Sequence, residues 1–284
     1  MPDVRNRTSF FAFKAAALVA ALFVATSASA LTLEEARENG IRIGFQNEPP
    51  YAFIGDDGKI MGTDNVLVMS VLEKMGVTKV EAVVMDFAAL IPGLQANRLD
   101  VVPSMFILPK RCELVAFSNP IWRGGSAFLV ATGNPKNLHS YDDVAEGDAV
   151  VGVMAGAVEQ EYAKKAGIPE DRITPLADAA ALLESVKAGR VDAVILTPDS
   201  VSAMAERSGG DAERADPFEN PPFANAFAAS VFRIDDSEIR LAFNDALKGT
   251  VGTPEFMEML KPNGYTEDNL PGAMTADERC AMTE

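Results

Sequence analysis

The chain of 284 residues is 48% hydrophobic and 23% charged, values typical of a globular protein, which excludes disorder as its main state. Its 25 Lys and Arg residues are outnumbered by 41 Asp and Glu residues, so the net charge is −16 and no basic field exists to hold nucleic acid or an anionic membrane surface. Two cysteines are too few for a disulfide-rich scaffold or a cysteine-rich metal site.

The N-terminal segment has the three parts of a secretory signal peptide. Arg5, Arg7 and Lys14 precede an apolar run at 15–25, and small residues follow as far as Ala30. The run is too short to cross a bilayer, which takes roughly twenty residues. We therefore expect residues 1–30 to be a cleaved signal peptide. No cysteine near the cleavage point can carry a lipid anchor, so we expect a mature protein that is soluble in the periplasm.

Cys112 and Cys280 would then lie in an oxidising compartment. Two interpretations stay open: two buried free thiols, or one disulfide that ties the C-terminal tail to the body. A bridge across 112–280 would stabilise the fold by about 5 kcal/mol on the chain-entropy model.

Along the mature chain, strand-like and helix-like segments alternate. The first series predicts strands at 41–45, 80–85 and 100–103, with helices from Thr63 or Asp64 to Gly76 and at 86–97. The second predicts strands at 149–153, 173–176 and 191–196, with helices at 155–166 and 179–188. A strand at 226–233 and helices at 235–247 and 253–260 follow.

This alternation predicts an α/β protein with two lobes, each a mostly parallel sheet flanked by helices. Two crossings, near 118–128 and 223–232, would form a two-stranded hinge. Lobe 1 would comprise 31–122 plus 229–284, and lobe 2 would comprise 123–228. Because ligands of open α/β sheets bind outside the carboxyl ends of the strands, we expect the site in the cleft between the lobes.

Eight motifs in order resemble the extracellular solute-binding proteins of ABC importers, in the polar-amino-acid branch (family 3). They lie at 45–53, 58–62, 90–100, 109–111, 117–120, 151–156, 188–193 and 261–265. The resemblance implies the type II periplasmic-binding-protein fold, closure around one small solute and delivery to a membrane permease. It implies no cofactor and no catalysis, and we expect a monomer. Within the branch the chain is most similar to the ectoine/hydroxyectoine-binding members.

Arg111 is the residue that the resemblance places on the ligand carboxylate, because a guanidinium offers two parallel donors to two oxygens. The alternative is a surface arginine at a helix start. Two positions depart from the amino-acid binders: Phe106 and Leu108 replace hydroxyl residues, and Thr197 replaces the aspartate that pairs the α-ammonium. Asp199 could substitute for that aspartate through a loop shift.

Aromatic residues stand where the polar clamp is missing. Tyr51, Phe87 and Phe106 lie at loop ends where the family keeps its ligand contacts, and rings there would hold a delocalised cation by about 0.5–2 kcal/mol each. Glu48 would accept N–H groups of that cation. The alternative is core packing for the rings and a solvated loop position for Glu48.

The second lobe should complete the site at the turn that holds Gly156, Ala157 and Val158, whose backbone N–H groups would suit a carboxylate. Glu159 follows, as a polar contact or a complement to the helix dipole. His139 is the only histidine and has no plausible metal partners, so no metal site is expected.

The expected function is capture of ectoine or 5-hydroxyectoine, a carboxylate with an amidinium-like ring. The alternative in the same class is a polar amino acid or a betaine. An enzyme on this fold would need an acid or base in the cleft, for which Glu48 is the one good candidate. A sensor domain would normally continue into a membrane span.

Overall fold

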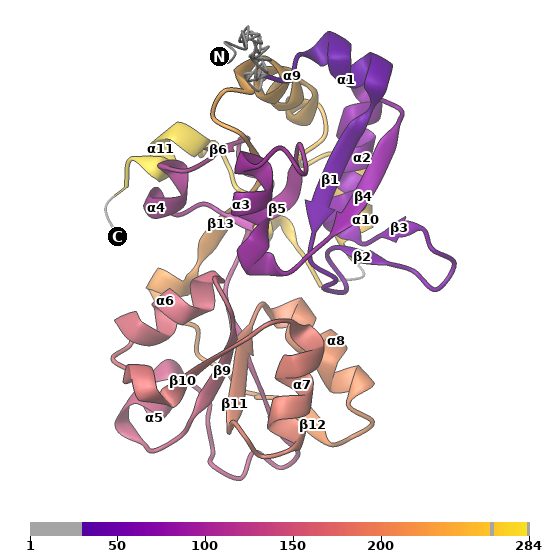
Figure 1. The fold of residues 1–284 in the computed structure, drawn as a ribbon. Helices are drawn as coiled ribbons and strands as arrows, with labels where there is room; N and C mark the ends of the chain where they lie inside the picture. Colours follow the sequence, from indigo (N-terminus) through magenta and orange to yellow (C-terminus); the bar gives the residue numbers. More distant parts are fainter. Residues whose placement is uncertain (1–29, 262–263, 283–284) are drawn as a thin grey trace, which may run out of the picture.

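The computed structural model describes residues 30–261 and 264–282. All of the predicted signal peptide except Ala30 lies outside the described residues. Figure 1 shows two lobes, one above the other, with the chain crossing between them. The upper lobe holds both the early and the late parts of the chain, and the lower lobe holds the middle part.

The upper lobe is built on three short sheets, one of which is centred on a long late strand. β1 (Ile41–Phe45) and β4 (Val80–Val84) are parallel, and Ile43 forms a parallel bridge with Val101, next to β5. Strand β13 (Ala226–Phe232) pairs antiparallel with β5 (Val102–Phe106), β6 (Ala116–Phe117) and β7 (Trp122–Gly124). A small hairpin joins β2 (Phe53–Ile54) to β3 (Ile60–Met61).

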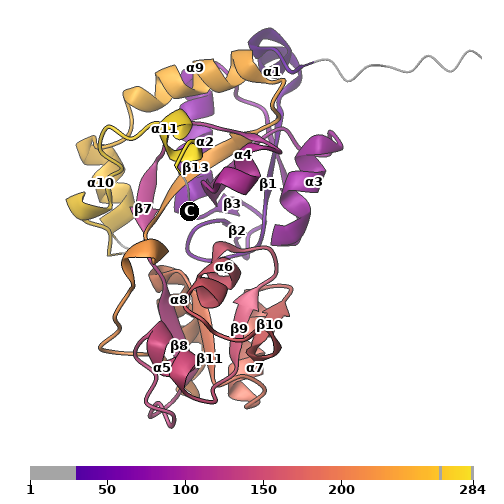
Figure 2. The same cartoon turned by 90° about the vertical axis from the view of Figure 1, so that its left-hand side faces the viewer.

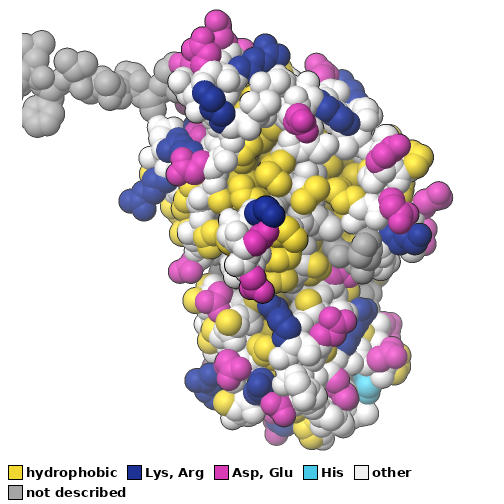
Figure 3. Space-filling view, turned by 90° about the vertical axis from the view of Figure 1, so that its right-hand side faces the viewer, with side chains coloured by type: hydrophobic (Ala, Val, Ile, Leu, Met, Phe, Trp, Pro, Cys, Tyr) yellow, Lys and Arg dark blue, Asp and Glu magenta, His cyan; other side chains and the backbone are white. Residues whose placement is uncertain are grey.

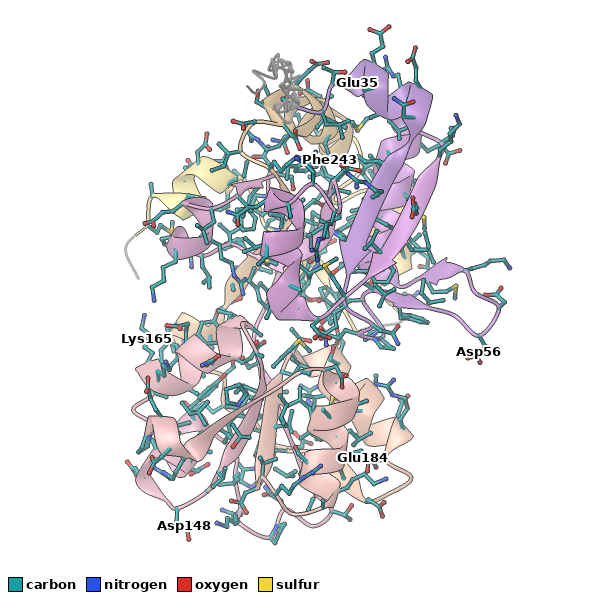
Figure 4. The ribbon with its side chains drawn as sticks, in the orientation of Figure 1. Glu35, Asp56, Asp148, Lys165, Glu184 and Phe243 are labelled. Atoms are coloured by element: carbon teal, nitrogen blue, oxygen red, sulfur yellow. A yellow bond between two sulfur atoms is a disulfide. The ribbon has the colours of Figure 1, made fainter. Side chains whose placement is uncertain are left out.

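Helices cover this lobe on several sides, with α10 and α3 on opposite sides in the view of Figure 2. Their bounds are α1 (Leu33–Asn39), α2 (Thr63–Lys74), α3 (Leu90–Gln95), α4 (Pro109–Cys112), α9 (Ser237–Lys248), α10 (Pro254–Leu260) and α11 (Ala276–Cys280), with a 3-10 turn at Phe87–Ala89. In the core, Phe243 of α9, labelled in Figure 4, packs on Phe232 with ring centroids 5.3 Å apart.

The lower lobe has one five-stranded sheet in the order β10-β9-β11-β8-β12. Its strands are β8 (Ala127–Ala131), β9 (Val151–Met154), β10 (Ile173–Leu176), β11 (Ala193–Leu196) and β12 (Ala212–Arg214), and its helices are α5 (Tyr141–Glu146), α6 (Val158–Lys165), α7 (Ala179–Lys187) and α8 (Pro198–Arg207). Side chains alternate across the sheet: Ala193 and Ile195 of β11 face α5 and α6, while Val194 and Leu196 face α7 and α8.

The sheets are mixed, so the expectation of mostly parallel pairing needs correction. β9, β10 and β11 are parallel, but β8 pairs antiparallel with both β11 and β12. The reason is the path of the chain: β8 enters the lobe from the hinge and runs away from the cleft, whereas β9 and β11 run back toward it.

Two segments connect the lobes, where the sequence predicts a hinge. β7 and β13 pair side by side there, with Trp122 opposite Ala228 and Gly124 opposite Ala226. Within the described residues no helix is both long and apolar enough to span a membrane. Figure 3 shows acidic and basic side chains interspersed with apolar patches on one face of the molecule.

Helix α2 begins differently from the prediction. Neither Thr63 nor Asp64 caps it by a side chain; Gly62 is the N-cap residue, with φ +100°. A Cβ at Gly62 would collide with the backbone of Tyr51, so glycine permits the close approach. The Asp64 backbone N–H donates to the Tyr51 carbonyl (2.9 Å), and the Asp64 side chain is thereby turned into the lobe.

Candidate functional site

A cavity of about 80 Å³ lies between the lobes and is lined from both of them. Its walls come from the carboxyl ends of β1, β4, β5, β9 and β11 and the segments that follow them, as expected for an open α/β sheet. The structure places six of the seven predicted site residues in these walls: Glu48, Tyr51, Phe87, Phe106, Arg111 and Val158.

Arg111 is buried, with 7% of its surface exposed, so the surface-arginine alternative is wrong. Its guanidinium donates to the Phe106 carbonyl (2.7 Å) and, across the cleft, to the Gly156 carbonyl (2.9 Å). The guanidinium carbon lies 5.5 Å from the centroid of the Phe87 ring. These contacts fix the plane of the fork in the cavity wall, the condition for two parallel bonds to one carboxylate.

Gly156 has a different role from the predicted one, because it does not line the cavity and presents its carbonyl to Arg111. The Ala157 N–H is also engaged, since it donates to the Met154 carbonyl (3.0 Å) to close the turn from β9 into α6. The predicted cradle of backbone donors at this turn is therefore wrong for Ala157, and the turn instead supplies an acceptor that bridges the lobes.

Tyr51, Phe106 and Trp122 form a connected aromatic wall in which Trp122 is a ring beyond the predicted three, while Phe87 lines the cavity beside Arg111. Trp122 lines the cavity, stacks on Tyr51 with centroids 5.4 Å apart and planes 7° apart, and meets Phe106 edge-on at 5.3 Å. Its strand, β7, lies in one of the two predicted hinge crossings. Apolar neighbours and ring faces make this wall suited to a weakly hydrated cation.

Three carboxyl groups line the same cavity: those of Asp64 and Glu159, which are buried, and that of Glu48, which is partly buried. Glu48 accepts from the Ser200 hydroxyl of the lower lobe (2.7 Å), and Asp64 accepts from the Trp122 indole N–H (3.1 Å). The sequence predicts Asp64 as a possible helix cap and Glu159 as either a polar contact of the site or a complement to the helix dipole; the two residues are only 4% and 2% exposed. Their carboxyl groups therefore belong to the cavity wall.

Burial is the largest influence on the pKa of each of these groups. Desolvation raises the pKa of Asp64 and of Glu159 to about 7, and it also raises the pKa of Glu48. The charge of Glu48 raises the pKa of Asp64 and Glu159 further, while the positive charge of Arg111 lowers that of Glu159. The cavity is therefore poor in cations and favours a positively charged occupant.

Gln46 is a cavity residue that the sequence reasoning missed. Its side-chain oxygen accepts from the Phe87 backbone N–H (3.1 Å), which fixes the orientation of the amide. The Nε2 group is buried and has no hydrogen-bond partner among the described residues. A buried donor of this kind calls for an acceptor on a bound molecule. Its position directly after β1 was the available signal.

Cys112 and Cys280 form a disulfide, so the bridged interpretation is confirmed and the free-thiol alternative is wrong. The bridge joins α4, which carries Arg111, to α11 in the C-terminal tail. Among the described residues no group of His, Cys, Asp and Glu side chains is arranged to hold a metal ion.

Comparisons with known proteins agree with this architecture. The chain is 34% identical over 276 residues to a probable amino-acid ABC transporter periplasmic-binding protein of Sinorhizobium fredii, covering 94% of this chain and 91% of that protein. It is 28% identical over 242 residues to the lysine/arginine/ornithine-binding periplasmic protein of Escherichia coli, covering 82% and 90%. The crystal structure of EhuB in complex with hydroxyectoine superimposes with a TM-score of 0.79 at 32% identity, covering 88% of this chain and 98% of EhuB.

Residues 41–261 match the family described as bacterial extracellular solute-binding proteins, family 3. This match spans both lobes and every residue that lines the cavity. The chain therefore belongs to the bacterial extracellular solute-binding proteins, family 3, and is the solute-binding component of an ABC transporter of the amino-acid type.

Proposed function

We propose that this protein captures ectoine or 5-hydroxyectoine in the cavity between its lobes and delivers it to the membrane permease of an ABC importer. The observation that carries the proposal is the meeting of one buried guanidinium, a wall of aromatic rings and buried carboxyl groups around about 80 Å³. The likeness to a hydroxyectoine complex at 32% identity supports the same solute class.

Each part of such a ligand has a counterpart in the wall. The ligand carboxylate pairs with the Arg111 fork, and the Gln46 amide donates a further hydrogen bond to it. The delocalised cationic ring lies against Tyr51, Phe87 and Phe106, each contributing about 0.5–2 kcal/mol when water is excluded. Glu48 accepts hydrogen bonds from the N–H groups of the ring and supplies the negative charge opposite the cation. Val158 closes the site from the lower lobe, and the Gly156 carbonyl of the same lobe accepts from Arg111.

Binding is a hinge closure of two bodies, 31–122 plus 229–284 and 123–228, about the paired strands β7 and β13. Interlobe bonds from Glu48 to Ser200 and from Arg111 to Gly156 form the closed state. We propose that the protein works as a monomer in the periplasm after residues 1–30 are removed, without a cofactor and without catalysing a reaction. A likeness to an ancestral amino-acid-binding precursor of a dehydratase, at 26% identity, concerns a binding protein as well.

A basic amino acid is the second candidate ligand, and the excess of carboxyl groups over cations in the cavity favours it. The relative that binds lysine, arginine and ornithine supports this class. Against it, Thr197 lines the cavity where an aspartate would pair an α-ammonium. A betaine has no N–H group that could donate a hydrogen bond to Glu48, so among the zwitterions we expect it to bind more weakly than ectoine.

A ligand panel tests the proposal. Thermal shift and calorimetry with ectoine, 5-hydroxyectoine, arginine, lysine, glycine betaine and proline should give the largest stabilisation with the two ectoines, because a ligand of the folded state raises stability by RT ln(1 + [L]/Kd). Tighter binding of arginine or lysine would replace the first candidate by the second. Binding of neither class would contradict the proposed function.

A further inference from the structure

A second, larger pocket of about 500 Å³ adjoins the ligand cavity between the lobes. Tyr51 and Trp122 line both spaces, so these two side chains form the partition between them. Tyr265, Asp199 and Arg214 line only the outer pocket. Tyr265 and Asp199 therefore contact the partition from outside the ligand cavity, whereas Asp64, which accepts from the Trp122 indole N–H, lines the ligand cavity itself.

A chain of hydrogen bonds holds the partition and crosses from one lobe to the other. The Tyr265 hydroxyl donates to the Tyr51 hydroxyl (3.1 Å), and the Tyr51 hydroxyl donates to Oδ2 of Asp199 (2.9 Å). Tyr265 comes from the C-terminal segment after α10, Tyr51 from the loop after β1, and Asp199 from the first turn of α8 in the lower lobe. Both phenols are buried, at 8% and 7% exposure.

The rings reinforce the same arrangement. The Tyr265 ring meets Trp122 edge-on (5.4 Å, 90°), and Trp122 stacks on Tyr51. Tyr51 is thus fixed by its ring and its hydroxyl at once. Desolvation raises the pKa of both phenols well above 10, so both hydroxyls keep their protons and act as donors.

We propose that Tyr265 and Asp199 are positioning residues that hold Tyr51 in the cavity wall and latch the lobes together, so that residues outside the ligand cavity set ligand affinity. The part of this inference that concerns affinity rests on the proposed function, whereas the latch itself does not depend on the ligand. Loss of the Tyr265 hydroxyl leaves its ring on Trp122 but removes the donor that orients Tyr51.

The test compares Tyr265→Phe and Asp199→Asn with wild type, using Tyr141→Phe as a matched control. Tyr141 is also a buried tyrosine, but its hydroxyl donates to Ser126 within the lower lobe (2.9 Å), away from the cavity. Calorimetry with the ligand found in the panel should show a Kd about 10-fold weaker for Tyr265→Phe, the scale of one hydrogen bond in a charge-assisted chain. The control should keep its Kd within twofold.

The double variant, Tyr265→Phe with Asp199→Asn, should lose little more ligand affinity than Asp199→Asn alone, because both residues act through Tyr51. A Kd unchanged in Tyr265→Phe, or weakened equally in Tyr141→Phe, would overturn the inference. Small-angle scattering of the ligand-free proteins separates this failure from a failure of the proposed function. A larger radius of gyration is expected for Tyr265→Phe than for Tyr141→Phe, and if no panel ligand binds, equal radii would refute the latch.

Discussion

At the scale of single residues, the cavity is defined by an imbalance of charge. Glu48, Asp64 and Glu159 line it, and among the described lining residues Arg111 supplies the one guanidinium. Carboxyl groups with a pKa near 7 carry a proton part of the time at neutral pH. A bound cation would favour the ionised form of these carboxyl groups, so we expect binding of a cationic ligand to be accompanied by release of a proton.

Arg111→Ala should weaken ligand binding at least about 30-fold, because truncating one partner of a buried charge pair costs about 2–5 kcal/mol. Arg111→Lys keeps the positive charge but loses the two parallel donors of the guanidinium, so its Kd should lie between those of wild type and Arg111→Ala. Calorimetry of the three proteins provides the measurement. A change in Kd of less than threefold in Arg111→Ala would show that Arg111 does not bind the ligand carboxylate.

Asp64→Asn should flatten the dependence of stability on pH. Since the folded pKa is raised from 3.8 to about 7, the contribution of this group is fully present below 3.8 and is lost as pH rises through about 7. Wild type should therefore lose free energy of unfolding between pH 5 and pH 8, and Asp64→Asn should lose less. Asparagine retains an oxygen to accept from Trp122.

Urea denaturation at the two pH values gives the comparison, with Asp148→Asn as the control. Asp148 is exposed, points outward in Figure 4, and has its pKa lowered by a hydrogen bond from Lys136, so it is charged throughout this range. Equal slopes for wild type and Asp64→Asn would show that Asp64 does not titrate here.

At the scale of secondary-structure elements, the shortest of the described α-helices carries Arg111, the cation of the cavity wall. Helix α4, Pro109–Cys112, is a single turn and depends on tertiary contacts for its place. The disulfide from Cys112 to Cys280 ties it to α11, whose Ala276 is buried in the same hydrophobic cluster as Leu90 and Phe117. The C-terminal tail thereby supports the arginine of the cavity.

The double variant Cys112→Ser with Cys280→Ser should lose up to about 5 kcal/mol of unfolding free energy, because the bridge spans 168 residues of chain. It should also bind ligand more weakly, since α4 would lose its attachment. Urea denaturation and calorimetry measure the two effects, and reduced wild type should reproduce both. An unchanged Kd would show that Arg111 is held by its carbonyl contacts alone.

Helices and strands with a clear pattern of apolar residues could be predicted from the sequence. Strands whose direction depends on where the chain enters a lobe could not. The strand at 41–45 and the helix from Ala179 match the structure closely. Strand β8 and the antiparallel pairing around it were missed, because direction depends on where the chain enters a lobe. In the site, side chains at strand ends were found, whereas Gly156 was misassigned because turn geometry decides which backbone group faces the cleft.

At the scale of the whole molecule, the two lobes meet through a few specific bonds around the cavity. Glu48 accepts from Ser200, and Arg111 donates to Gly156, each joining the upper lobe to the lower. Two paired strands are the covalent connections, so rotation about them leaves most of each hydrophobic core intact, and Leu108 is an upper-lobe residue that packs in a lower-lobe cluster. Closure can therefore proceed as a motion of rigid bodies.

Ligand should lower the radius of gyration of the wild-type protein. Ser200→Ala should bind with a Kd several-fold weaker, because the closed state loses one hydrogen bond to the partly buried carboxyl group of Glu48. Small-angle scattering with and without ligand follows the closure. Ser185→Ala is the control, since its buried hydroxyl bonds within α7 to Leu182 (2.7 Å). An identical radius in both states would contradict hinge closure in solution.

The covalent bond at Cys280 has a practical consequence for measurement. It fixes Cys280 of α11 to the upper lobe, where α11 lies beside α4 in Figure 1. The turn at Gly209 and Gly210, between α8 and β12, belongs to the lower lobe and has open space around both Cα atoms. One fluorophore attached after α11 and another in that turn would lie on different lobes. Energy transfer between the two fluorophores would then report closure of the lobes around the solute.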